Sequence, residues 1–344
     1  MVNKSKTITL LPYLQQVKNR KKILTSIFLG KTPKIIEFKN GKKINVESLD
    51  FNLLVCLLGA ITFSTSYTII NGKIEFSFDT KNKFSVNIEN PEPEDKILLE
   101  LFFYAQKYGA NFIKDDQTKD FRDDTLRIYS DCGKKIIETN AGIKFYVDSI
   151  HPRILTETFV QKIHLINSQD DWKNKTVLDI GASFGDTPLF YSQLGAEVYA
   201  IEANKTIYEN MLKNFSLNPS LSKKITPVNM AVGKLRYQLY KNNYNQSDLE
   251  EYTFEQTFEK LGLSHVDLLK LDCKGCEHEL TEKFLKNVNR IKIEYREYGA
   301  KNQKLEDLLK LLDNSGFKTM IYRHSPLDNN SNKNFGLLYG FSDH

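Results

Sequence analysis

The segment that most constrains this chain lies near its middle, where two apolar runs flank a glycine-containing turn and a helix-like stretch. The first run, 177–180, leads into Gly181, and the turn closes at Gly185. The second run, 198–201, ends in Glu202. In an open α/β sheet, such glycines let a ligand approach the backbone, and an acid ending the second strand accepts both ribose hydroxyls. The segment therefore predicts a nucleoside-binding crevice.

The details of the turn indicate which nucleoside is bound. A dinucleotide fingerprint requires the spacing G-x-G-x-x-G, whereas the turn Gly181–Gly185 has the spacing G-x-x-x-G. Asp179 and Asp186 bracket it, and two carboxylates repel a pyrophosphate. The same carboxylates suit a ligand that carries an ammonium and a sulfonium. We therefore expect S-adenosylmethionine as the cofactor and rank a nicotinamide oxidoreductase last.

Five motifs follow one another in the order and spacing of a known family. They are Asp179-Ile-Gly-Ala-Ser-Phe-Gly-Asp186, Glu202-Ala-Asn204, Asn229-Met-Ala-Val-Gly233, Val266-Asp-Leu-Leu-Lys-Leu-Asp272 and Ile291-Lys-Ile-Glu-Tyr295. Over roughly residues 145 to 344, the chain resembles the FkbM family of class I methyltransferases. The resemblance implies an S-adenosylmethionine-dependent enzyme that methylates a hydroxyl of a glycan, a glycolipid or a related metabolite.

One motif departs from the family pattern. The family usually shows D-x-E-G-x-E after the fourth strand, whereas this chain has Asp272-Cys-Lys-Gly-Cys-Glu277. Lys274 therefore replaces a carboxylate and reverses one charge beside the expected acceptor crevice. This replacement also favours an alternative, a binding module that keeps the fold without catalysis.

Position in the sheet assigns a role to each candidate cofactor residue, because ligands bind at the carboxyl ends of parallel strands. Asp179 and the turn would hold the methionine part, Glu202 would hold the ribose, and Asn229 to Ala231 would lie against the adenine. The full set of candidates is Asp179, Gly181, Ala182, Ser183, Gly185, Asp186, Glu202, Ala203, Asn229 and Ala231. Two bland alternatives stay open: Asp179 capping the turn, and Glu202 as an exposed strand-end acid.

The catalytic candidates lie on the fourth and fifth strands. Lys270 and Asp272 alternate along one strand and share a face, and a buried lysine requires a carboxylate partner. The pair could be purely structural, or Lys270 could position Asp272 or an approaching hydroxyl. A sugar hydroxyl is a weak nucleophile, so we expect a general base, Asp272 first and Glu294 second. Together with Glu277 these acids could form an acidic rim. His151 and His164 are weaker candidates.

The cysteines predict neither a disulfide framework nor a metal centre. Cys56, Cys132, Cys273 and Cys276 fit a reducing compartment. The pair Cys273–Cys276 also has the spacing of a redox pair or of half a zinc site. Because Cys56 and Cys132 are isolated, we interpret the Cys-x-x-Cys spacing as coincidence and expect no metal.

Length and pattern predict two domains in the 344 residues. Residues 1–148 read as a small α+β accessory domain of antiparallel hairpins with a basic arm, and residues 149–344 as the methyltransferase domain. The latter should be a Rossmann-like sheet of seven strands, with helices on both faces and an antiparallel edge pair. The expected strands are 175–180, 197–202, 225–230, 266–272, 289–295, 317–323 and 335–341. The expected helices are 186–194, 205–216, 251–262, 276–287 and 302–315.

The amino-terminal arm is strongly basic. Residues 1–46 hold eleven Lys or Arg and one acid, a balance of +10 in a chain with a net charge of +5. A solvated arm explains this balance, as does attraction to lipid headgroups, a phosphate-linked substrate or RNA. RNA methylation is therefore the enzymatic alternative, although no RNA-binding signature is visible. No signal peptide is visible and the apolar run Phe51–Phe63 is too short to span a bilayer. We expect a cytoplasmic protein in peripheral contact with an anionic membrane, acting on a small-molecule, glycan or lipid-linked sugar acceptor.

Overall fold

A computed structural model describes residues 4–77, 83–108, 111–114, 125–165, 171–233, 249–273, 275–297, 304–324 and 335–342. The chain divides into two compact units, Met1–His164 and Leu165–His344. This division places the helix Pro152–Phe159 in the first unit, whereas the sequence grouped it with the second. Separate roles for the two units stay a prediction.

The first unit combines short sheets with helices. Its helices are α1 (Lys4–Leu10), η1 (Leu11–Tyr13), α2 (Arg20–Phe28), α3 (Phe51–Phe63), α4 (Pro93–Lys107), η2 (Val147–Ser149) and α5 (Pro152–Phe159). Its strands are β1 (Ile35–Glu37), β2 (Lys43–Asn45), β3 (Ser66–Ile70), β4 (Lys73–Ser77), β5 (Lys83–Asn87), β6 (Asn111–Lys114), β7 (Thr125–Asp131), β8 (Lys134–Thr139) and β9 (Lys144–Tyr146). The expected antiparallel hairpins include β1–β2 and β3–β4, which turn at Asn40-Gly41 and Asn71-Gly72. β6 and β7 pair in parallel, which departs from the expected all-antiparallel hairpins.

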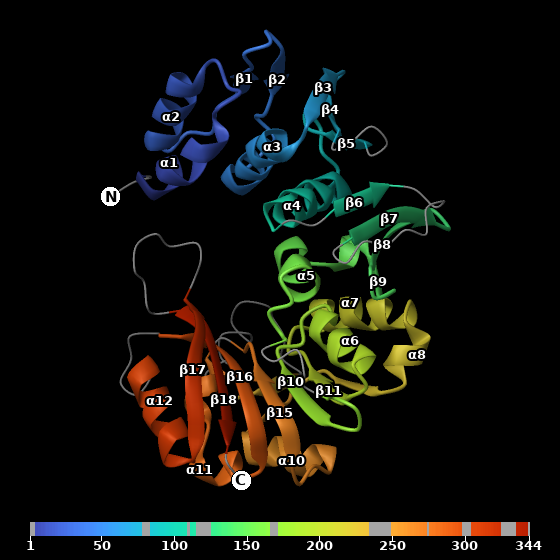
Figure 1. Ribbon diagram of the computed structural model, residues 1–344, viewed down its shortest axis with the longest axis vertical. Helices are drawn as coiled ribbons and strands as arrows, with labels where there is room; N and C mark the ends of the chain where they lie inside the picture. The colour runs from blue at the N-terminus through green and yellow to red at the C-terminus, as the bar shows by residue number, and fades with distance from the viewer. Residues whose placement is uncertain are drawn as a thin grey trace. The chain divides into compact units, whose positions relative to one another are not determined.

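The second unit is built on one sheet of seven strands. Its strands are β10 (Thr176–Ile180), β11 (Glu197–Ile201), β12 (Ile225–Val228), β15 (Val266–Leu271), β16 (Val288–Arg296), β17 (Phe317–His324) and β18 (Phe335–Ser342). Their order is β12-β11-β10-β15-β16-β18-β17, and β18 runs antiparallel to both of its neighbours. Strand order therefore reverses beside β10, the first strand. The expected class I methyltransferase sheet, with its antiparallel edge pair, is confirmed (Figure 1).

Helices connect the parallel strands of this sheet. They are α6 (Asp186–Gln193), α7 (Lys205–Ser216), α8 (Pro219–Ser222), α10 (Phe254–Leu261), η3 (Cys276–Glu279), α11 (Glu282–Leu285) and α12 (Leu305–Asn314). A small parallel pair, β13 (Ala231–Val232) and β14 (Glu251–Tyr252), lies outside the large sheet. Among the helices of the described residues, none combines the length and the apolar character needed to cross a bilayer.

Two helix predictions are corrected. The expected helix 276–287 is broken into η3 and α11, because Leu280 is extended and the Thr281 side chain accepts from Phe284 N at 3.1 Å, starting a new helix. The expected helix 251–262 begins only at Phe254, where Thr253 and Gln256 form a capping box. Residues 251–252 instead form β14.

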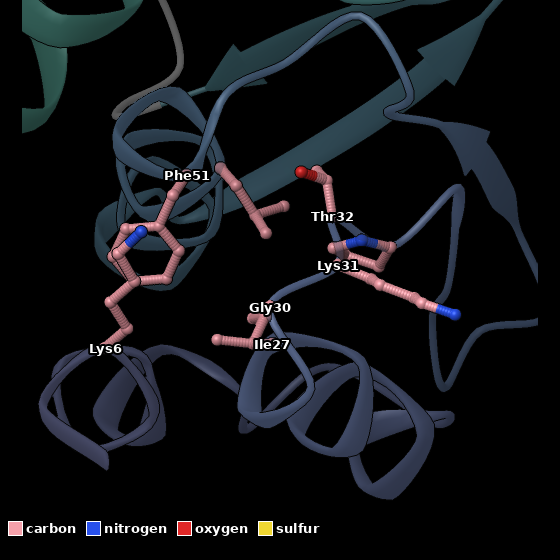
Figure 2. A pocket seen from close by; sticks show the side chains of 8 residues that line it. Lys6, Ile27, Gly30, Lys31, Thr32 and Phe51 are labelled. Carbon is pink, nitrogen blue, oxygen red and sulfur yellow. The ribbon is translucent and has the colours of Figure 1, made fainter. Parts of the chain in front are cut away.

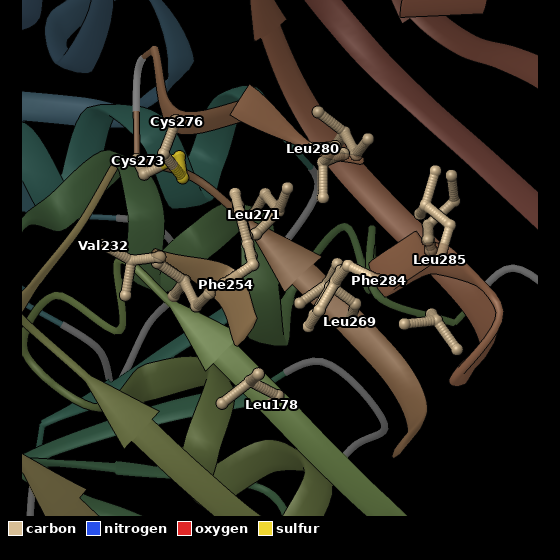
Figure 3. Close-up of a cluster of buried hydrophobic side chains, with 14 of the residues drawn as sticks. Leu178, Val232, Phe254, Leu269, Leu271, Cys273, Cys276, Leu280, Phe284 and Leu285 are labelled. Carbon is tan, nitrogen blue, oxygen red and sulfur yellow. A yellow bond between two sulfur atoms is a disulfide. The ribbon is translucent and has the colours of Figure 1, made fainter. Parts of the chain in front are cut away.

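The core of the second unit is formed by side chains of the central strands and of the helices that pack against them. Figure 3 shows Leu178 of β10 and Leu269 and Leu271 of β15 beside Phe254 and Phe284 from the connecting helices. All five side chains are buried. This packing fixes the carboxyl ends of β10 and β15, from which the candidate site residues project.

Candidate active site

The turn between β10 and α6 is held by its own backbone and by its neighbours. The N–H groups of Gly181 and Ala182 both donate to the carbonyl of Ile201, each at 2.9 Å. Gly181 has φ +87° and Gly185 has φ +91°, a region that favours glycine. A Cβ at Gly181 would collide with the carbonyl oxygen of Asp272. The turn therefore needs Gly181 to pack against the end of β15.

Gly185 serves the packing of the second connecting helix. A Cβ there would lie 2.7 Å from Phe215 Cε1 and 3.0 Å from Met211 Cγ, both on α7. Sequence reasoning assigned this glycine to the approach of a ligand, and the structure adds helix packing as a reason for it. Its role in ligand contact stays a prediction.

Glu202 organises the residues expected around a ribose. Its side chain is 5% exposed, with Oε2 accepting from Ser183 N at 3.0 Å and Oε1 from Asn204 N at 2.8 Å. The Asn229 side-chain amide donates to the carbonyls of Glu202 at 2.7 Å and Ala203 at 3.2 Å. Burial raises the pKa of the Glu202 carboxyl, and the two backbone N–H groups oppose that rise. The alternative of an exposed strand-end acid is therefore wrong.

Asp179 forms a buried ion pair with Lys270. The distance from Lys270 Nζ to Asp179 Oδ1 is 2.7 Å, and Lys270 Nζ also donates to the carbonyl of Gly181 at 3.3 Å. The Asp179 side chain is 0% exposed and the Lys270 side chain is 8% exposed. Burial lowers the pKa of Lys270, but the charges of Asp179 and Asp272 more than offset this, so its pKa stands above the usual range. The expected carboxylate partner of Lys270 is confirmed and is Asp179.

A second buried lysine, Lys292 on β16, was missed by sequence reasoning. It is 3% exposed and stands next to Lys270 in the register of the sheet, so that Asp179, Lys270 and Lys292 form a row across three strands. The charge of Lys292 lowers the pKa of Asp179, against the larger effect of burial, which raises it. The alternation of Lys292 and Glu294 along β16 was the available signal.

Two carboxylate oxygens in this cluster retain free acceptor capacity. Asp179 Oδ2 and Asp272 Oδ1 are buried and have no hydrogen-bond partner among the described residues. The backbone holds Asp272 beside the turn, because its N–H donates to the carbonyl of Ile180 at 2.9 Å. Buried acceptors without donors are costly unless a ligand or water supplies the hydrogen. The two oxygens therefore mark places for hydrogen-bond donors of a ligand, such as an ammonium or a hydroxyl group.

The expected acidic rim is wrong for Glu277. This side chain is fully buried, with Oε2 accepting from Gly275 N at 2.6 Å and Oε1 from Arg296 N at 3.1 Å. It thus ties the segment after β15 to the end of β16. Glu294, the second base candidate, accepts from Arg296 Nη2 at 3.2 Å and is 20% exposed.

The Cys-x-x-Cys pair forms a disulfide, so the expectation of unpaired cysteines is wrong for Cys273 and Cys276 (Figure 3). The Cα atoms lie 5.6 Å apart, within the normal range for disulfides, and Gly275 with φ 144° turns the backbone between them. The two cysteine Sγ atoms and a carboxylate oxygen of Glu277 lie within 4.8 Å of one another, and all three residues are buried. Lys274, the departure from the family pattern, lies outside the described residues.

The remaining candidates occupy varied positions. Asp186 begins α6 and is 1% exposed, Ala182 is buried in the turn, and Ala231 is buried in β13. His151 and His164 belong to the first unit, where His164 Nε2 lies 3.2 Å from Thr158 Oγ1.

This donor and acceptor set fits S-adenosylmethionine. Each oxygen of Glu202 accepts one backbone N–H and keeps a lone pair for a ribose hydroxyl. Asp179 Oδ2 is available to an ammonium, and the positive charge of Lys270 suits a carboxylate. The cluster therefore offers a complementary group to each charged or hydroxyl part of the cofactor.

Comparison with known proteins agrees with this assignment. Residues 179–319 match the model of the methyltransferase FkbM domain. A probable histone-arginine methyltransferase, CARM1 of Oryza sativa subsp. indica, is 32% identical over 89 residues, which are 24% of this chain. The chain spans only 17% of the length of that relative.

Two solved structures are similar at low identity. Fibrillarin of Aeropyrum pernix, with bound S-adenosyl-L-methionine, is 12% identical over 80% of this chain and 98% of its own, with a TM-score of 0.36. Trm5b of Pyrococcus abyssi is 15% identical over 67% of this chain and 72% of its own, also with a TM-score of 0.36. The match to the domain model covers the turn, Glu202 and the ion pair, and it confirms the predicted family and cofactor. The chain thus carries a methyltransferase FkbM domain over residues 179–319, with S-adenosylmethionine as its cofactor.

Proposed function

We propose that this protein is an S-adenosylmethionine-dependent O-methyltransferase that acts on a hydroxyl of a glycan, a glycolipid or a related metabolite. The observation that carries the proposal is the cluster of the buried Asp179, Lys270 and Glu202 with the half-buried Asp272, at the carboxyl ends of β10, β11 and β15, inside the FkbM domain. The acceptor class is the one that the family resemblance implies.

The residues of the cluster divide into holding and proton-accepting groups. When bound, the cofactor supplies an electrophilic methyl group on a sulfonium. Glu202 would accept the ribose hydroxyls, while Asp179 and Lys270 would fix the charged amino-acid end. Holding the acceptor in line with the methyl group can contribute about 7–11 kcal/mol in favourable systems.

Asp272 is the proposed general base. When the cofactor's methyl group is transferred to the acceptor oxygen, Asp272 Oδ1 would take the proton that the hydroxyl loses, contributing about 10²–10⁴-fold. The oxygen is suited to this role because it accepts no hydrogen bond from the described residues. Lys270, whose charge lies near Asp272, acts as a positioning residue.

The test separates chemistry from cofactor binding. Methyl-labelled cofactor is incubated with glycan and lipid-linked sugar acceptors, and transfer is followed by mass spectrometry. Asp272→Asn should lower turnover by about 10²–10⁴-fold, with cofactor affinity kept within a few-fold. Glu294→Gln is the matched control for the second base candidate. Equal losses of turnover and affinity in Asp272→Asn would assign this residue to binding and overturn its role as base.

The basic arm supports RNA as a second candidate acceptor. Residues 1–46 carry +10, which could track phosphates. A gel shift with total RNA that weakens steeply with salt, together with methyl transfer to RNA, would favour this candidate. Cofactor binding without transfer to either acceptor class would favour the non-catalytic module.

A further inference from the structure

Exposed apolar side chains are concentrated at the start of the first unit. Five of the twelve large apolar side chains that the described residues expose lie within the first 35 residues: Ile8, Leu11, Phe28, Leu29 and Ile35. Phe28 and Leu29, which are 57% and 63% exposed, are adjacent at the end of α2. Two neighbouring side chains of this size, both mostly in water, favour contact with an apolar partner.

A small hollow adjoins this apolar pair. It is lined by Lys6 of α1, Ile27 of α2, the segment 30–33 and Phe51 of α3, and it encloses about 50 Å³. Figure 2 shows Lys6 and Phe51 on one side, with Lys31 and Thr32 on the other. Lys6 Nζ lies 5.1 Å from the centroid of the Phe51 ring. On this measure one water needs roughly 10–15 Å³, so the hollow has room for a small anionic group such as a phosphate.

The positive charge around the hollow has little compensation within the segment. Glu37, the one acid of residues 1–46, pairs with Lys18 at 2.8 Å. Lys34 Nζ pairs with Oε1 of Glu47, the residue that follows this segment, at 2.7 Å. Most of the eleven basic residues therefore contribute to a positive field that attracts anions.

We infer that Lys6, Phe28, Leu29 and Lys31, together with the hollow between α1, α2 and α3, form a docking surface for anionic phospholipids at a membrane. We call it the α1–α2 surface. Phe28 and Leu29 enter the boundary between headgroups and acyl chains, while the lysines contact lipid phosphates and carboxylates. The aliphatic Leu29 favours a bilayer over RNA, because single-stranded RNA is bound by aromatic stacking within a basic groove. The inference does not depend on the methyltransferase activity.

The test is flotation of the full chain with vesicles of phosphatidylcholine alone or with phosphatidylserine added. The chain should float with the anionic vesicles and not with the neutral ones. Phe28→Ser/Leu29→Ser should weaken binding at least tenfold. Lys6→Gln/Lys31→Gln should weaken it about 25-fold at low salt, since each basic residue contributes about fivefold, and much less at high salt.

Matched control variants exclude a general effect of charge or hydrophobicity. Lys223→Gln/Lys283→Gln removes two exposed lysines of the second unit, and Leu212→Ser removes an exposed leucine there. Both controls should bind within twofold of the parent chain, and circular dichroism should show that every variant is folded. Equal binding to neutral vesicles, equal losses in the controls, or full retention in both test variants would overturn the inference. RNA binding that is lost in the lysine variant, without vesicle binding, would overturn it in favour of RNA.

Discussion

Replacing Lys270 by methionine should destabilise the fold by about 3 kcal/mol at neutral pH, because it leaves the Asp179 carboxylate buried without its partner. The two charges are 2.7 Å apart, and Asp179 is 0% exposed. At an effective dielectric constant of about 20, their attraction is roughly 6 kcal/mol, partly offset by the desolvation of both groups. Removing one partner of a buried pair costs about 3–5 kcal/mol, and the nearby charge of Lys292 places our value at the lower end.

The loss should depend on pH in a defined direction. Burial raises the pKa of Asp179 and Lys270 opposes that rise, so the variant should raise this pKa further. An acid with a raised pKa in the folded state binds more protons there than in the unfolded state, and stability then falls as pH rises. The deficit of Lys270→Met should therefore shrink as pH falls and Asp179 takes up its proton, by up to about 1.4 kcal/mol per pH unit.

Urea unfolding measures both effects. Trp172, the one tryptophan of the chain, is buried in the second unit beside Tyr191 and reports its unfolding by fluorescence. Asp179→Asn/Lys270→Met, which removes both charges, should be more stable than Lys270→Met alone. A loss below about 1 kcal/mol, a loss that is equal at pH 5 and pH 8, or strictly additive single losses would refute a buried ion pair of this strength.

Three further predictions follow from single contacts. Gly181→Ala should destabilise the second unit far more than Gly142→Ala destabilises the first. Both glycines have positive φ, but only the Cβ added at position 181 would collide with backbone atoms. Comparable losses of stability in thermal unfolding would contradict this prediction. Affinity for the cofactor, followed by calorimetry, should fall as pH drops through the raised pKa of Glu202, and Glu202→Gln should remove that dependence. Reducing the Cys273–Cys276 disulfide to two thiols with dithiothreitol should speed hydrogen exchange in residues 275–279, whereas Cys276→Ser should show no response to the reductant. Exchange that is unchanged by reduction would argue against a role of the disulfide in holding this segment.

Much of the fold was predictable because its signals are local. Apolar runs separated by helix-like stretches gave the strands of the second unit, and the absence of a helix between the last two gave their antiparallel pairing. The need of a buried lysine for a carboxylate correctly predicted a partner for Lys270. Its identity depends on register, because Asp179 faces Lys270 across two adjacent strands.

Other features were not predictable because they depend on distant contacts. Glu277 resembles an active-site acid in the sequence, but its oxygens are used by the backbone of Gly275 and Arg296, a residue 19 positions away. The break at Thr281 depends on a side-chain cap that overrides the helical pattern. The disulfide depends on the positive φ of Gly275, which the spacing Cys-x-x-Cys alone does not specify.

The most direct test of the central claim is calorimetric titration of the protein with S-adenosylmethionine, with NAD as the control ligand. Micromolar binding of S-adenosylmethionine, no binding of NAD, and loss of binding in a folded Glu202→Ala variant are the expected results, because Glu202 holds Ser183 and Asn204 in place and accepts the ribose. Unchanged affinity in Glu202→Ala, or binding of NAD in place of S-adenosylmethionine, would contradict the account.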